Sequence, residues 1–261
     1  MNKNIGRTII TASVCMSFFG LAGCKTDEIN CVVNGKKPES CNLYTAKATV
    51  DSPLEDKVVI IGDSLWDYGK PHGAIPLKLI ELSGKTYYEL ARSGAFTSYI
   101  LDDEIPKIPK EDNVYALKSV LVNGGANNVR TPCEIDLENN VNVTAETFSQ
   151  SCNDAIAEAE IGAEQIIGRL VAIPSVDHVV WVGPQYFPIE KVSAELVDFV
   201  SDRISTLCAA ESKCHFVDLR GIWSQSNADA YLFDKEHVNQ DGAELVGNEI
   251  WQKMESIGAY R

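Results

Sequence analysis

A serine, a histidine and an aspartate are placed where they could form a nucleophilic site. Ser64 follows the apolar run at 58–61, so it lies at the carboxyl end of a predicted buried strand, where parallel sheets place their active sites. A serine hydroxyl becomes a good nucleophile when an adjacent base removes its proton. His237 can be that base, and Asp234 can accept the other imidazole N–H and fix its tautomer.

The other histidines fit the role of base less well. His178 and His215 begin predicted strands, which is the wrong edge of a parallel sheet, and His72 is close to Ser64 only in sequence. We interpret these three as structural or surface histidines. Two alternatives stay open at this point: Asp234 could be a helix cap beside a surface histidine, and Gly-Asp-Ser-Leu alone could be an ordinary turn.

Four ordered blocks follow predicted strands and together span about residues 56–255. They read Gly62-Asp63-Ser64-Leu65, Ser93-Gly94, Gly125-Ala126-Asn127 and Asp234-Lys235-Glu236-His237. These blocks resemble the SGNH, or GDSL, hydrolase family, whose pattern is a serine in GDS(L), a glycine, an asparagine in GxN and a C-terminal DxxH. The resemblance implies a flavodoxin-like, three-layer α/β/α fold with a central parallel sheet.

The same resemblance implies an oxyanion hole and an ester substrate. Acyl transfer develops a negatively charged oxygen, which the family pattern stabilises with the backbone N–H groups of Ser64 and Gly94 and the side-chain amide of Asn127. The implied reaction is hydrolysis of acyl or acetyl esters through an acyl-enzyme, with no metal or cofactor. Two positions depart from the pattern: no asparagine precedes Gly94 in its block, and Val238 replaces the proline that often follows the histidine.

Two other functions remain open. An acyltransferase differs from an esterase only in the molecule that accepts the acyl group, and no sequence feature excludes it. A surface lipoprotein could keep the fold and bind a glycan or a protein without turnover, although the complete set of triad and oxyanion residues disfavours this. Substrate choice would come from loops at the strand ends, where candidate pocket walls are Trp66, Asp67, Tyr68, Phe96, Asn128 and residues 183–187.

The elements that must position these residues form a predicted βαβ succession. Short apolar runs alternate with helical stretches, which indicates a parallel sheet. Residues 131–150 are expected to be irregular, with Cys133 and Cys152 on either side. We predict strands at 58–61, 87–91, 119–123, 178–182 and 215–219, and helices at 76–82, 151–171, 194–210 and 241–254.

The N-terminus predicts export to the cell envelope. Lys3 and Arg7 precede an apolar stretch at 8–20 that is too short to span a membrane. The following Leu21-Ala22-Gly23-Cys24 resembles the lipobox of bacterial lipoproteins, in which the cysteine becomes diacylated or triacylated and anchors the protein to a membrane. In Gram-negative lipoproteins an aspartate at the position of Lys25 retains the protein in the inner membrane, so the resemblance implies the outer membrane if the organism has one. A plain secretory signal is the alternative.

These features divide the chain into three parts. We predict a signal peptide at 1–23, a lipid-anchored tether at 24–55 and the hydrolase domain at 56–261. The formal charge is -14. Loss of residues 1–23, which hold two basic residues and no acidic one, leaves 21 basic against 37 acidic residues, or -16. This acidity disfavours nucleic acid as a partner.

The cysteines also fit an exported protein. Apart from Cys15 in the signal and Cys24, six remain, an even number in an oxidising compartment, which predicts three disulfides. Fifteen pairings of six cysteines exist, and pairing of sequence neighbours fits the clustering best. A metal site is the competing interpretation, but no CxxC pair has zinc-ligand spacing. The predicted pairs are Cys31 with Cys41, Cys133 with Cys152, and Cys208 with Cys214.

Overall fold

The computed structural model describes residues 57–67, 74–85, 87–108, 117–139, 147–188 and 192–260. The predicted signal peptide, lipid anchor and tether lie outside these residues, together with Cys31 and Cys41. Tyr68 and His72 also lie outside them. No helix in the described ranges combines the length and the apolar character needed to cross a membrane.

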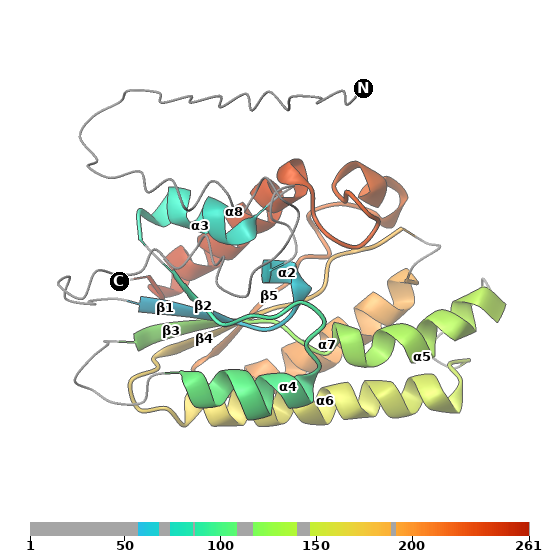
Figure 1. The fold of residues 1–261 in the computed structure, drawn as a ribbon, viewed down its shortest axis with the longest axis horizontal. Coiled ribbons are helices and arrows are strands. Elements are labelled where there is room, and N and C mark those ends of the chain that lie inside the picture. The colour runs from blue at the N-terminus through green and yellow to red at the C-terminus, as the bar shows by residue number, and fades with distance from the viewer. Residues whose placement is uncertain are drawn as a thin grey trace, which may run out of the picture. The chain divides into compact units, whose positions relative to one another are not determined.

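Five parallel strands form the centre of the domain (Figure 1), in the order β2-β1-β3-β4-β5 of flavodoxin-like sheets. Their register places Ile61, Val122, Trp181 and Phe216 level with one another. The carboxyl ends of the four strands therefore meet at one edge, and the predicted parallel sheet is confirmed. The strands are β1 (Lys57–Ile61), β2 (Tyr87–Glu89), β3 (Leu117–Val122), β4 (His178–Val182) and β5 (Cys214–Val217).

Helices cover both faces of this sheet, as Figure 1 shows. Successive strand residues point to opposite faces, so Val58 and Ile60 pack with α3 and α8, while Val59 and Ile61 pack with α6 and α7. This arrangement confirms the predicted three layers. The helices are α3 (Ile75–Ser83), α5 (Ala126–Asn139), α6 (Gln150–Val171), α7 (Ala194–Ala209), α8 (Gln240–Ile257) and the short α4 (Thr97–Tyr99), which continues as a π-helical turn (Ile100–Glu104).

The prediction of an irregular segment at 131–150 is wrong in its first half, because α5 continues through Pro132 to Asn139. Proline cannot donate the helical hydrogen bond to the carbonyl of residue 128, so α5 lacks one bond of its ladder at this point. Tertiary contacts compensate: Cys133 is buried and forms a disulfide with Cys152 at the start of α6. The local penalty of the proline is thus offset by packing against the neighbouring helix.

Two of the three predicted disulfides are confirmed. Cys133 pairs with Cys152 across 19 residues, and Cys208 at the end of α7 pairs with Cys214 at the start of β5. By restricting the unfolded chain, the longer loop contributes about 3 kcal/mol to stability in the loop-entropy account. The first disulfide joins α5 to α6, and the second joins α7 to the edge strand β5.

Candidate active site

Ser64 begins the short helix α2 (Ser64–Asp67), directly after β1 and a tight turn at Gly62 and Asp63. Gly62 has φ +129°, and a side chain there would collide with Asn123, so only glycine fits. The Asp63 amide donates to Asn123 Oδ1 at 3.0 Å, and Asn123 Nδ2 donates back to Asp63 Oδ1. These bonds fix Ser64, which is half-buried, at the carboxyl edge of the sheet.

A buried glutamic acid supports the same turn. Glu104 has no exposed surface, and its Oε2 accepts the Gly62 N–H at 2.7 Å, while Oε1 has no hydrogen-bond partner among the described residues. Burial raises the pKa of Glu104 to about 8, and the nearby charges of Asp63 and Asp103 act in the same direction. The hydrogen bond from Gly62 and the charge of Lys107 oppose this shift but do not cancel it. Glu104 therefore carries a proton at neutral pH.

Glu104→Gln is expected to remove a pH-dependent loss of stability. With a pKa of about 8 when folded and an ordinary value of 4.5, Glu104 binds more protons in the folded state, so the free energy of unfolding falls as the pH rises from about 4.5 to 8. The difference between the pKa values corresponds to a total loss on the order of 5 kcal/mol. Urea unfolding at pH 5 and pH 8.5 measures this loss.

The neutral glutamine should remove the part of the dependence that Glu104 contributes while keeping an acceptor for the Gly62 amide. Glu255→Gln, an exposed position on α8, is the matched control and should follow the wild type. If Glu104→Gln loses as much stability as the wild type over this pH range, the protonated state assigned to Glu104 is wrong.

His237 and Asp234 lie together on a turn between the last short helical segment (Gln225–Ala230) and α8. The His237 ring nitrogen Nδ1 is 2.7 Å from Asp234 Oδ2, and the backbone N–H groups of His237 and Glu236 donate to Asp234 Oδ1. Burial opposes ionisation of Asp234, but the hydrogen bonds from the His237 amide and ring and the Glu236 amide hold the pKa of Asp234 below its ordinary value. With the proton on Nδ1, Nε2 is the acceptor nitrogen.

The backbone around this turn is fixed at both ends. Phe233 N–H donates to the His237 carbonyl, and residues 232 and 238 form an antiparallel bridge. Asn239 then caps α8 by accepting the Gly242 N–H and donates its side-chain amide to the Ala230 carbonyl. These contacts hold the turn firmly although valine, and not proline, follows His237.

Asn127, in the first turn of α5, contacts the loop that contains Gly94. Its Nδ2 donates to the Ala95 carbonyl at 3.0 Å. Gly94 has φ +79° and lies in a turn closed by the Ala95 N–H and the Arg92 carbonyl, and Arg92 N–H donates to the Gly62 carbonyl. The blocks that contain Ser64, Gly94 and Asn127 are therefore linked by direct hydrogen bonds.

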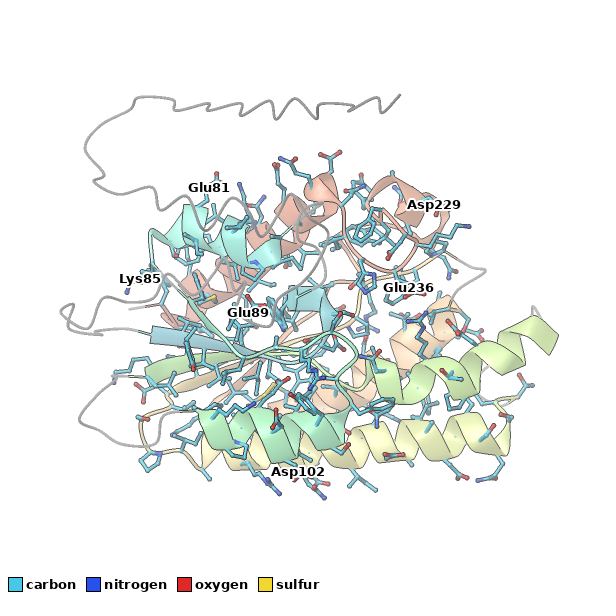
Figure 2. The ribbon with its side chains drawn as sticks, viewed as in Figure 1. Glu81, Lys85, Glu89, Asp102, Asp229 and Glu236 are labelled. Atoms are coloured by element: carbon cyan, nitrogen blue, oxygen red, sulfur yellow. A yellow bond between two sulfur atoms is a disulfide. The ribbon has the colours of Figure 1, made fainter. Side chains whose placement is uncertain are left out.

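A cavity of about 120 Å³ brings Ser64, Asn127 and His237 together in one site. Gly94 and Asp234 do not line this cavity, but Asp234 contacts His237, which does. Figure 2 shows Glu236, which also lines the cavity, between the C-terminal loops and helices α5 and α7.

The predicted pocket walls are confirmed in part. Gly183, Pro184, Gln185 and Phe187 line the cavity, but Tyr186 donates its hydroxyl to Asp198. Three other candidates do not line the cavity. Trp66 is fully buried in the core, the side chain of Phe96 is 49% exposed, and the side chain of Asn128 accepts a hydrogen bond from the Thr97 backbone N–H. Nothing is described for the side chains of Asp67 and Tyr68.

Sequence reasoning missed three groups at this site. Asn123 and Glu104 hold the turn before Ser64, and Arg130 of α5 forms ion pairs with Glu134 and with Glu236 beside His237. Only Asn123 had a usable signal, since it is the last residue of the strand predicted at 119–123 and so lies at the active edge. The contacts of Glu104 with Gly62 and of Arg130 with Glu236 join segments distant in sequence.

The histidines at the opposite edge are confirmed as remote from the site. His178 and His215 lie on β4 and β5 with ring nitrogens 3.2 Å apart, and neither lines the cavity. Among the described residues, no group of three or more histidine, cysteine, aspartate or glutamate side chains is arranged to hold a metal ion.

Comparison with known proteins agrees with this architecture. Residues 60–245 match the sequence model described as the GDSL-like Lipase/Acylhydrolase family. No curated protein matches the chain by sequence.

Three solved structures share the fold at low sequence identity. A protein from Streptococcus pneumoniae, provisionally described as a platelet activating factor, is 16% identical with a TM-score of 0.56 over 77% of this chain and 85% of its own. The lipase Lip_vut3 from a goat rumen metagenome is 17% identical with a TM-score of 0.54 over 76% and 96%. Axe2, an acetylxylan esterase from Geobacillus stearothermophilus, is 15% identical with a TM-score of 0.52 over 78% and 96%.

Proposed function

Since the chain belongs to the GDSL-like lipase/acylhydrolase family, and is therefore a serine hydrolase acting on esters, we propose that it cleaves carboxylic esters with Ser64, His237 and Asp234. The observation that carries the proposal is the hydrogen-bonded pair of Asp234 and His237, whose ring lines the same cavity as Ser64. The names of the similar structures, a lipase and an acetylxylan esterase, support an ester as the substrate.

The proposed reaction has two acyl-transfer steps. His237 Nε2 takes the proton of Ser64 Oγ as the oxygen bonds to the ester carbonyl carbon, and the same proton then passes to the departing alcohol as its C–O bond breaks. A water molecule next attacks the acyl-enzyme and gives a proton to His237. That proton returns to Ser64 as the acid leaves. Asp234 stabilises the imidazolium in both steps.

We expect the developing oxyanion to be stabilised by donors around Ser64. The candidates are the Ser64 and Gly94 N–H groups and the amide of Asn127. Asn127 uses one amide hydrogen for the Ala95 carbonyl, which orients the side chain and leaves its second hydrogen for the oxyanion. Such preorganised donors act without reorganisation during the reaction.

Asn127→Ala is expected to lower kcat about 10²–10³-fold, the usual effect of removing one oxyanion donor. Steady-state hydrolysis of p-nitrophenyl butyrate measures the change, and the unfolding midpoint in urea shows whether the fold is kept. Asn248→Ala on α8, outside the cavity lining, is the control. A kcat within a few-fold of the wild type would remove Asn127 from the oxyanion hole.

The lipobox-like sequence at 21–24 supports a second part of the proposal. We propose that the chain is processed before Cys24, lipidated there and held at the cell envelope, so that its esters are envelope lipids, acylated glycans or imported compounds. The mass of the full chain expressed in a Gram-negative host should correspond to loss of residues 1–23 and gain of acyl groups. Cys24→Ala should lack the acyl mass; an identical mass gain in that variant would contradict lipidation at Cys24.

A further inference from the structure

The cavity beyond Ser64 has aliphatic walls. They come from Val129 of α5, from Val182 at the end of β4, and from Leu196, Val197 and Val200 of α7, all less than 10% exposed. Leu196 and Val200 are four residues apart, so they lie on one face of α7 about 6 Å apart along its axis. The apolar lining therefore extends along more than one turn of that helix.

Four polar residues of the cavity that the proposed reaction does not use form contacts with one another. Arg130 forms ion pairs with Glu134 and Glu236, and the buried Gln185 donates its amide to the Glu236 carbonyl. A sugar hydroxyl pushed against the valines would lose its hydrogen bonds to water without replacement. An alkyl chain in the same place would instead bury apolar surface, which is favourable.

The volume indicates how long a chain the cavity can enclose. An apolar protein cavity of about 150 Å³ is known to hold benzene, a molecule of six carbon atoms. The cavity beside Ser64 measures about 120 Å³. A straight chain of about four to six carbons, counted from the carbonyl, is therefore the expected occupant.

We propose that this cavity holds the acyl part of the ester, so that the preferred substrates carry straight acyl chains of about four to six carbons. The inference rests on the proposed function, in which the acyl group stays bonded to Ser64 while the alcohol departs. The acyl group must stay bound until water attacks the acyl-enzyme, whereas the alcohol leaves before that step. An apolar cavity therefore suits the group that stays, and the open side suits the group that leaves.

The first test is a chain-length series on the wild-type chain. We expect kcat/KM for p-nitrophenyl esters to rise about fourfold per methylene from acetate to butyrate, hence about 15-fold in total. It should be highest at butyrate or hexanoate and no higher at decanoate. A maximum at acetate, or a flat series, would overturn the inference.

Variants of Val200 test where the chain lies. Val200→Phe should shorten the cavity and lower the ratio of hexanoate to acetate kcat/KM at least tenfold, whereas Val200→Ala should move the preference to chains about two carbons longer. Ile204→Val, a buried position one turn further along α7 that does not line the cavity, is the matched control and should keep the wild-type ratio. Unchanged ratios in both folded Val200 variants would overturn the inference.

Two further outcomes keep the hypotheses separate. Alkyl acetates from ethyl to hexyl vary the alcohol at a fixed acyl group, and a steeper length dependence in that series would place the alcohol in the cavity and overturn the acyl assignment. Absence of Ser64-dependent turnover on every ester would contradict the proposed function itself. Ser64-dependent turnover with no preference for chain length would contradict only the acyl cavity.

Discussion

Replacing Ser64 with alanine is expected to lower kcat for ester hydrolysis by about 10⁴–10⁶-fold, the range seen when the nucleophile of a serine triad is removed. Without the hydroxyl no acyl-enzyme can form, and the residual rate comes from binding and from the oxyanion donors. Hydrolysis of p-nitrophenyl butyrate under saturating substrate measures the loss. Ser64 Oγ makes no hydrogen bond with another of the residues that the structure describes. Its removal should therefore change the urea unfolding midpoint little.

A matched serine separates this effect from a general one. Ser256→Ala, at an exposed position on α8, should retain wild-type turnover. A burst of p-nitrophenol equal to one equivalent per chain is expected in the wild type whenever deacylation is slower than acylation, and it should vanish in Ser64→Ala. Turnover within tenfold of the wild type in Ser64→Ala would show that another group is the nucleophile.

The sheet could be predicted because its signals are local. The β-branched runs of β1, β3 and β4 are buried on both faces, so each appears as a short apolar segment that ends at a glycine, asparagine or proline. The predicted β4 has the observed bounds His178–Val182, and the predicted β1 differs from Lys57–Ile61 by one residue. Ser64 and Asn127 could be located for the same reason, since each follows such a strand.

The parts that escaped prediction depend on contacts between distant segments. The Gly62–Glu104 and Asp63–Asn123 hydrogen bonds join residues 42 and 60 positions apart, and no local pattern marks Glu104 as a buried acid. Helix α5 passes through Pro132 next to Cys133, which forms the disulfide to α6. The cavity walls on α7 resemble any apolar helix face, because burial against a sheet and exposure to a cavity require the same spacing of valine and leucine.

Asp234→Asn is expected to lower kcat by about 10⁴-fold while leaving the turn intact. Asn Oδ1 can still accept the backbone N–H groups of Glu236 and His237 that Asp234 accepts. The new side-chain NH₂ would face the ring and donate to His237 Nδ1, which moves the imidazole proton to Nε2. A protonated Nε2 cannot take the Ser64 proton, and the neutral amide no longer stabilises the imidazolium, which explains the size of the expected loss.

The design distinguishes catalysis from support of the backbone. Asp229→Asn removes a charge from an exposed site in the same C-terminal region, labelled in Figure 2, and should leave kcat unchanged. Asp234→Ala removes the backbone contacts as well, so it should lower the urea midpoint in addition to kcat, whereas Asp234→Asn should lower kcat alone. Asp234→Asn turnover within tenfold of the wild type would mean that Asp234 holds the turn but does not set the tautomer of His237, and the base would then act without a carboxylate partner.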